Sequence, residues 1–175
     1  MIECFADEVK QSIRNIPDFP KRGILFRDIT PLLLDGGKFK RCVDWFASLS
    51  PEKPDYVISI ESRGFIFGSA LACEIGAGFV PIRKEGKLPH DTFRTSYQLE
   101  YGEATLEIHA DAMEKGKKAV IIDDVLATGG TVQAAIKLVN QCGVEISGVY
   151  FLIELTNLLG RGKLKDYPVH SLISY

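Results

Sequence analysis

The chain has 175 residues, with 21 Lys and Arg against 23 Asp and Glu, so its formal net charge is -2. Apolar residues make up 46% and charged residues 25%, an ordinary globular composition that excludes wholesale disorder and suits a single domain over residues 1–175. The weak negative charge argues against a nucleic-acid or membrane-surface partner, because such proteins usually carry a strong basic excess.

The N-terminal segment is predicted to form a helix followed by a loop. Phe5, Val9 and Ile13 fall four residues apart, which predicts an amphipathic helix that ends before Pro17. The prolines and glycine of residues 17–31 predict an irregular stretch after it. No apolar run has the length of a signal peptide core or of the roughly 20 residues that span a bilayer, so we expect a cytoplasmic protein.

A second amphipathic helix is predicted around residues 39–49, and from Asp55 onward short apolar runs alternate with helical patterns. The expected strands are 56–60, 78–84, 119–124 and 148–155, and the expected helices are 64–76 and 131–143. Strands that are apolar on both faces and separated by helices indicate a mostly parallel sheet covered on each side, which is the α/β class.

The segment between Lys84 and His109 interrupts this alternation. Residues 85–96 are polar and contain glycine and proline, which predicts a long loop. Residues 97–109 form two alternating runs broken at Gly102, which predicts an antiparallel hairpin. Because long polar loops inside compact domains are usually functional or disordered, this segment is a candidate for function.

The four cysteines, Cys4, Cys42, Cys73 and Cys142, are widely spaced and form no CxxC pair. This spacing argues against a zinc site and against a disulfide scaffold. We interpret the four residues as reduced thiols of the core, and Cys73 and Cys142 in particular lie in apolar helical contexts.

The strongest chemical signal is the segment VIIDDVLATGGT, residues 120–131, which joins a buried strand to a helix. The carboxyl ends of strands form the ligand crevice of an open α/β sheet. Residues 128–131 offer consecutive backbone N–H groups, two hydroxyls and a helix N-terminus, a combination that binds phosphate. A side chain in place of Gly129 is expected to fill the phosphate space. The chain contains neither GxxxxGK[ST] nor GxGxxG, which excludes a Walker A loop and a Rossmann fingerprint.

Two carboxylates, Asp123 and Asp124, stand directly before this phosphate-binding pattern. They would repel a phosphate, so they make sense as ligands of sugar hydroxyls attached to that phosphate, or of water around a Mg²⁺ ion that neutralises a diphosphate. The alternative interpretation is that both residues only end the strand and cap the next turn.

The segment IIDDVLATGGT resembles the signature of type I phosphoribosyltransferases, whose substrate is 5-phospho-α-D-ribose 1-diphosphate (PRPP) with Mg²⁺. The segments FPKRGILFRDITPLL, IESRGFIFG, IRKEGKLP, YQLEYG and LIELTNLLGR are similar, in the same order, to the adenine phosphoribosyltransferase family over roughly residues 12–175. The resemblance implies purine salvage, the transfer of the 5-phosphoribosyl group to adenine to give AMP and diphosphate, by a homodimer. It also implies a central mostly parallel sheet flanked by helices, an N-terminal hood mainly in residues 1–34, and a flexible catalytic loop at about residues 84–102.

The resemblance assigns roles to residues at four parts of the site. The 5-phosphate is expected on Ala127, Thr128, Gly129, Gly130 and Thr131, and the ribose hydroxyls on Asp123 and Asp124. The diphosphate is expected on Glu61, Ser62, Arg63, Arg83, Lys84 and Lys87, some of them from the adjacent subunit, with a cis peptide between Glu61 and Ser62. Adenine is expected between Phe26 and Leu155, with its edge read by the backbone of Leu25 and Arg27. The catalytic residues are expected to be Glu100, which handles a proton near adenine N7, with Tyr101 and Arg63.

Without the resemblance, several of these residues have plainer interpretations. Arg63 and the cations of residues 83–87 would be solvated charges, Glu100 an exposed strand residue and Phe26 ordinary packing. Mg²⁺ is expected to be held mainly by substrate and water. A 6-oxopurine substrate is disfavoured because Ala127 stands where relatives that use such bases commonly have an acid. A regulator that senses PRPP without catalysis is the alternative from another class. His90 and His109 are expected to have loop and strand-end roles.

Overall fold

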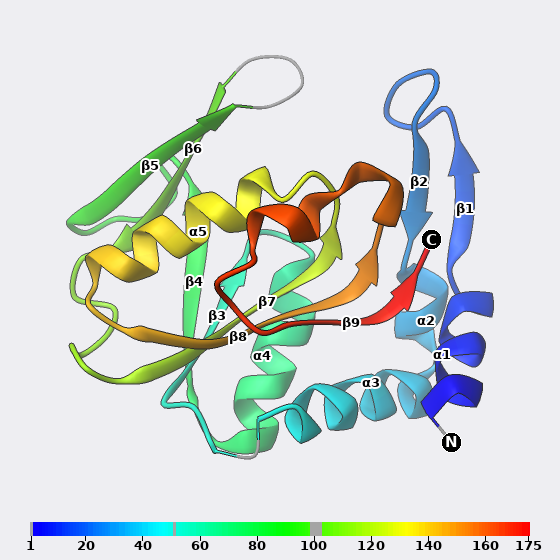
Figure 1. Ribbon diagram of the computed structural model, residues 1–175, viewed down its shortest axis with the longest axis horizontal. Coiled ribbons are helices and arrows are strands. Elements are labelled where there is room, and N and C mark those ends of the chain that lie inside the picture. Colours follow the sequence, from blue (N-terminus) through cyan, green and yellow to red (C-terminus); the bar gives the residue numbers. More distant parts are fainter. Residues whose placement is uncertain (1, 51, 99–102) are drawn as a thin grey trace.

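The computed structural model describes residues 2–50, 52–98 and 103–175. Its centre is a seven-stranded sheet with the strand order β5-β6-β4-β3-β7-β8-β9 (Figure 1). The pairs β4–β3, β3–β7, β7–β8 and β8–β9 are parallel, whereas β5 and β6 join antiparallel at one edge. The predicted α/β class with a mostly parallel sheet is therefore confirmed.

The elements have the following bounds. The strands are β1 Arg14–Pro17, β2 Leu25–Asp28, β3 Tyr56–Ile60, β4 Gly78–Lys84, β5 Thr92–Gln98, β6 Glu103–His109, β7 Lys118–Leu126, β8 Glu145–Glu154 and β9 Val169–Ser174. The helices are α1 Ile2–Gln11, α2 Thr30–Leu34, α3 Gly36–Ser48, α4 Gly64–Ile75 and α5 Gly130–Gln141, with two short 3-10 helices, η1 Thr156–Leu158 and η2 Gly160–Lys163.

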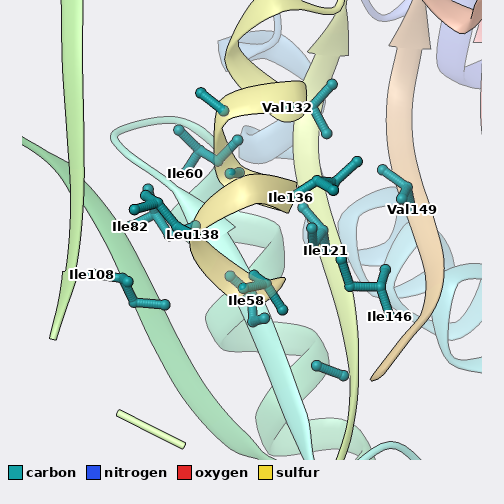
Figure 2. Packing of buried hydrophobic residues seen from close by; sticks show 14 of the residues in the cluster. Ile58, Ile60, Ile82, Ile108, Ile121, Val132, Ile136, Leu138, Ile146 and Val149 are labelled. Atoms are coloured by element: carbon teal, nitrogen blue, oxygen red, sulfur yellow. The ribbon is translucent and has the colours of Figure 1, made fainter. Parts of the chain in front are cut away.

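The central strands are apolar on both faces because helices cover the sheet on both sides. Ile58 and Ile121 belong to a cluster with α5 side chains such as Ile136, which Figure 2 shows beside one another. The neighbouring residues Val57 and Val120 point to the opposite face, where side chains of α1, α3 and α4 pack. This alternation is the reason why the sequence runs read as continuous apolar stretches.

The N-terminal segment differs from the prediction. Helix α1 ends at Gln11, and Arg14–Pro17 pairs antiparallel with Leu25–Asp28, so that part of the predicted irregular stretch is a β-hairpin. Its turn uses left-handed backbone at Asp18 and Gly23, and the Gly23 N–H donates to Asp18 Oδ1 over 2.6 Å. The residues of the turn stabilise this hairpin, and a search for hydrophobic periodicity does not detect them.

The polar segment before the second hairpin is also more ordered than predicted. Strand β5 already begins at Thr92, inside the predicted loop 85–96. Arg94 of β5 pairs with the buried Glu107 of β6 across the strands, with 2.9 Å between Nε and Oε1. Charge pairing across the hairpin stabilises a strand that apolar patterning cannot identify.

Two further sequence interpretations need correction. Cys42 and Cys142 are buried free thiols, but Cys4 and Cys73 are exposed, so the core interpretation is wrong for those two residues. Strand β9, which pairs parallel with β8 at the edge of the sheet, was not predicted from the sequence. Within the described ranges, no helix combines the length and the apolar character needed to cross a membrane.

Candidate active site

The loop of residues 127–131, called the phosphate loop below, connects the end of β7 to the start of α5. It encloses a cavity of about 70 Å³ whose lining residues are Asp123, Val125, Leu126, Ala127, Thr128, Gly129, Gly130, Thr131 and Val132. Backbone N–H groups at the N-terminus of a 12-residue helix face such a space with partial positive charge. The structure thus gathers all five residues expected at the 5-phosphate around one small cavity.

Gly129 has left-handed backbone, with φ 78°, at the N-cap of α5. A Cβ at this position would lie 2.8 Å from the carbonyl oxygen of Gly160, which belongs to η2. A Cβ at 129 would therefore meet the backbone of residue 160 first, and the expectation that a larger side chain there fills the phosphate space stays a prediction. Gly160 itself escaped the sequence reasoning, although it lies in the matched segment LIELTNLLGR.

The acidic pair lies where β7 ends, beside the phosphate loop. The Asp124 N–H donates to Asp123 Oδ1 over 2.9 Å. Burial and the neighbouring Asp124 charge raise the pKa of Asp123 well above its usual range. Burial also raises the pKa of Asp124, and Arg63 offsets part of that effect. The pair is therefore poor at holding two negative charges until hydroxyl donors or a cation approach it.

Gly64 allows the loop after β3, residues 61–63, to come close to these carboxylates. A Cβ at residue 64 would lie 2.6 Å from Asp123 Oδ1 and 2.9 Å from Ser59 Oγ. The absence of a side chain lets the start of α4 lie against the end of β7, so that residues 61–63 and Asp123 share one edge of the sheet. The peptide bond between Glu61 and Ser62 is cis, as expected.

Arg63 connects the acidic pair to strand β2. Its Nε lies 2.7 Å from Asp124 Oδ2, its Nη1 donates to the Arg27 carbonyl over 3.3 Å, and its guanidinium carbon lies 4.7 Å from the Phe26 ring centroid. These three contacts do not fit the plainer interpretation of Arg63 as a solvated charge. The residue stands between the expected ribose and adenine positions.

Glu61 holds two of the cations expected at the diphosphate. Its carboxylate lies 2.9 Å from Arg83 Nε and 2.7 Å from Lys87 Nζ. Burial opposes the ionisation of Glu61, but the hydrogen bonds from Lys87 and Arg83 outweigh it and lower its pKa. Lys84, the last residue of β4, is exposed beside them. Arg83 and Lys87 thus lie next to the loop that contains Ser62 and Arg63, and Lys84 follows Arg83 at the end of β4.

Leu25, Phe26 and Arg27 lie on β2. Phe26 lines an apolar pocket of about 390 Å³ between the β1–β2 hairpin and α4, together with Ile16, Phe19, Asp28, Ile29, Thr30, Leu33, Arg63 and Ile66. Leu155 is not among these residues. It follows β8 directly, and its N–H donates to the Leu126 carbonyl over 2.9 Å. The structure therefore brings Phe26 next to Arg63 and Leu155 next to the phosphate loop.

Glu100 and Tyr101 lie outside the described residues, so their expected roles stay predictions. Of the residues that the structure does describe, no three or more His, Cys, Asp or Glu side chains are grouped so that they could hold a metal ion. Asp124 Oδ2 is buried and accepts no well-aligned hydrogen bond, despite the nearby Arg63. This oxygen suits a sugar hydroxyl or the water around a cation.

Comparisons with known proteins agree with this geometry. The family described as "Phosphoribosyl transferase domain" matches residues 38–172. The adenine phosphoribosyltransferase of Geobacter metallireducens is 55% identical over 170 residues, covering 97% of this chain and 99% of that protein. The crystal structure of the enzyme from Thermoanaerobacter pseudethanolicus has a TM-score of 0.94 at 48% identity, covering 97% of this chain and 99% of the other. The crystal structure of the Saccharomyces cerevisiae enzyme has a TM-score of 0.92 at 42% identity, covering 97% of this chain and 99% of the other. On its fold, its phosphate loop and these relatives, the chain belongs to the adenine phosphoribosyltransferase family.

Proposed function

We propose that this protein transfers the 5-phosphoribosyl group of PRPP to adenine, giving AMP and diphosphate. The observation that carries this proposal is the phosphate cavity at residues 127–131 directly beside the carboxylates of Asp123 and Asp124. Phosphate and adjacent hydroxyls are the features of a ribose 5-phosphate group. The Saccharomyces cerevisiae relative was solved with adenine, and a Giardia lamblia relative of 34% identity with 9-deazaadenine, which supports adenine as the acceptor.

The reaction breaks the bond between the anomeric carbon and the diphosphate oxygen and forms a bond from that carbon to adenine N9. Its transition state has oxocarbenium character, so the site must fix the sugar and stabilise the leaving diphosphate. The phosphate loop anchors the 5-phosphate, and Asp123 and Asp124 accept hydrogen bonds from the ribose hydroxyls.

The diphosphate is bound by the loop of Glu61, Ser62 and Arg63 and by the cations Arg83, Lys84 and Lys87. Glu61 supports this assignment because it already gathers Arg83 and Lys87 beside the loop. When the diphosphate arrives, its oxygens compete with the Glu61 carboxylate for the same two side chains. Some of these cations act from the adjacent subunit in the proposed dimer.

The adenine edge contacts the backbone of Leu25 and Arg27, and its faces contact Phe26 and Leu155. Glu100, with Tyr101 beside it and Arg63, transfers the proton at adenine N7.

Measuring kcat against pH for wild type and Glu100→Leu tests the role of Glu100, with binding of PRPP as the control. We expect the variant to bind PRPP normally but to lose the ionisation that controls kcat, and an unchanged profile would reject the role.

Mg²⁺ is the proposed cofactor, held mainly by the substrate and by water. It would neutralise charge on the diphosphate. The buried, unsaturated Asp124 Oδ2 and the raised pKa values of both carboxyls fit a pair that gains from a nearby hydrated cation. The chain residues contribute orientation of that water through Asp123 and Asp124.

A homodimer is proposed for the assembly. The apolar side chains of Ile66 on α4 and Phe79 on β4 are 36% and 37% exposed, and Phe65 packs against Phe79 with 5.6 Å between ring centroids. Strand β4 continues from this apolar surface to Arg83 and Lys84, so a second copy docked there lies near the cations.

The proposed organisation is one domain over residues 1–175, with the hood mainly in 1–34 and the catalytic loop at about 84–102. We also propose a cytoplasmic location, which the four free thiols support.

A product assay with four bases tests the proposed function. The enzyme is incubated with PRPP and adenine, hypoxanthine, guanine or xanthine, with and without Mg²⁺, and the nucleotide formed is identified. We expect AMP from adenine only, and only with Mg²⁺. Turnover of hypoxanthine without adenine would replace adenine by a 6-oxopurine, and PRPP binding without any product would indicate a sensor.

A further inference from the structure

The segment after β8 is held by an ion-pair cluster around the buried Glu154, which the proposed reaction does not use. Glu154, the last residue of β8, is 7% exposed and pairs with Arg161 of η2. Arg161 Nε donates to Glu154 Oε1 over 2.9 Å, and its Nη1 donates to the Val169 carbonyl over 2.7 Å. The Ser171 hydroxyl donates to Glu154 Oε2 over 2.8 Å. We call Glu154, Arg161 and Ser171 the clamp.

The clamp fixes the residue that touches the phosphate loop. Gly160 precedes Arg161, and it approaches residues 127 and 129 so closely that a Cβ on it would collide with the Ala127 carbonyl oxygen and lie 2.9 Å from the Gly129 nitrogen. Gly160 is buried, although the residues on either side of it are exposed. The backbone of η2 is therefore the wall against which the phosphate loop rests.

The backbone before Gly160 is in an uncommon conformation. Leu159 has φ 53°, the left-handed region that a leucine rarely adopts, and its side chain is 78% exposed. An exposed side chain gains nothing from packing that would justify this backbone. Residues that persist in such conformations are held by their surroundings, and they cluster at functional sites. Arg161, two residues further along, is bonded to two strands, to Glu154 of β8 and to the Val169 carbonyl of β9.

We propose that Arg161, fixed by Glu154 and Ser171, is a positioning residue: it holds Gly160 in contact with the phosphate loop and so sets the geometry of that loop. This inference rests on the proposed function in one respect, namely that the loop binds the 5-phosphate of PRPP. Arg161 touches no substrate in this assignment and acts through Gly160. The same strand end holds Leu155, so the clamp also ties the phosphate loop to one wall of the proposed adenine site.

Binding of ribose 5-phosphate tests the clamp without any chemistry at the base. Isothermal calorimetry compares wild type with Arg161→Met, Arg161→Lys and Ser171→Ala. We expect the dissociation constant to rise about tenfold for Arg161→Met, less for Arg161→Lys, which keeps the charge but loses the planar fork, and about twofold to threefold for Ser171→Ala. In steady state, KM for PRPP should rise with kcat nearly unchanged, since the contact acts equally before and during reaction.

Asp55→Ala is the matched control for lost stability. Asp55 directly precedes β3, at the amino ends of the parallel strands and so away from the phosphate loop; it accepts the Lys118 N–H over 2.9 Å and pairs with Lys117. This variant should lower the melting temperature and leave ribose 5-phosphate binding unchanged. If Arg161→Met does not fold, Ser171→Ala decides the question, because its loss is one neutral hydroxyl.

Two results separate the possible failures. Clamp variants that bind ribose 5-phosphate like wild type, at any melting temperature, overturn the positioning role while leaving adenine turnover untouched. A wild-type enzyme that makes no AMP overturns the proposed function, yet ribose 5-phosphate binding still measures the clamp.

Discussion

Gly129→Val is expected to lower the affinity for PRPP by at least about 100-fold and to remove measurable turnover at ordinary substrate concentrations. Two effects combine at this residue. A branched side chain in left-handed backbone costs about 1–2 kcal/mol, and its Cβ would lie 2.8 Å from the Gly160 carbonyl oxygen. The loop must change its backbone to relieve both. Losing two hydrogen bonds from backbone N–H groups to the phosphate, each worth about 1.5–3 kcal/mol, accounts for the fall in affinity.

Gly116→Val separates the collision from the backbone cost. Gly116 has the same φ of 78°, but no atom lies within 4 Å of a Cβ placed there. Both variants should lose some stability in thermal unfolding, and only Gly129→Val should lose PRPP and ribose 5-phosphate binding by calorimetry. Equal affinities in the two variants would mean that the phosphate loop tolerates a side chain at residue 129.

The part of the site that the sequence predicts well is the part built by consecutive residues. Strand β7, the phosphate loop and α5 follow one another without interruption, so an apolar run, a Gly-Gly turn and a helical period suffice to place the cavity at residues 127–131. Asp123 and Asp124 are found by the same adjacency. Here local pattern and tertiary structure agree.

What the sequence could not predict depends on contacts between distant residues. The approach of Gly160 to Gly129 and the gathering of Arg83 and Lys87 by Glu61 join separate loops of the carboxyl edge. Periodicity carries no information about such pairs. The β1–β2 hairpin and the first residues of β5, from Thr92 to Ser96, were missed for a related reason, because turn geometry and cross-strand charges stabilise them instead of an apolar face.

Neutralising one residue of the acidic pair is expected to raise the stability of the protein and to lower its activity. Asp123→Asn removes a carboxyl whose pKa is raised by burial and by Asp124, and it keeps the size of the side chain. We expect the melting temperature of the ligand-free protein to rise by about 2–4 °C, equivalent to about 1 kcal/mol for a chain of this size. At the same time kcat/KM for PRPP should fall by about tenfold to 100-fold, because an amide accepts ribose hydroxyls less strongly than a carboxylate.

Asp44→Asn provides the matched control, since it makes the same charge change on α3. Asp44 is about half exposed and pairs there with Lys40. An ion pair at the surface contributes little, so this variant should change neither the melting temperature nor kcat/KM appreciably.

The dependence on pH identifies the cause of the stabilisation. In the folded protein the pKa of Asp123 lies above its unfolded value, so the folded state binds more protons in the interval between the two. Wild-type stability from this group is therefore complete below the ordinary aspartate range and is lost as pH rises through the raised value. The amide of Asp123→Asn does not titrate, so the gain in melting temperature over wild type should be small at acidic pH and should grow as pH rises. A gain that is the same at every pH would locate the stabilisation in packing, whereas a loss of stability at neutral pH would mean that Asp123 is stabilised as an anion by the fold itself. If the gain in melting temperature grows with pH, or is the same at every pH, the enzyme binds its sugar substrate with a group that lowers the stability of the ligand-free protein.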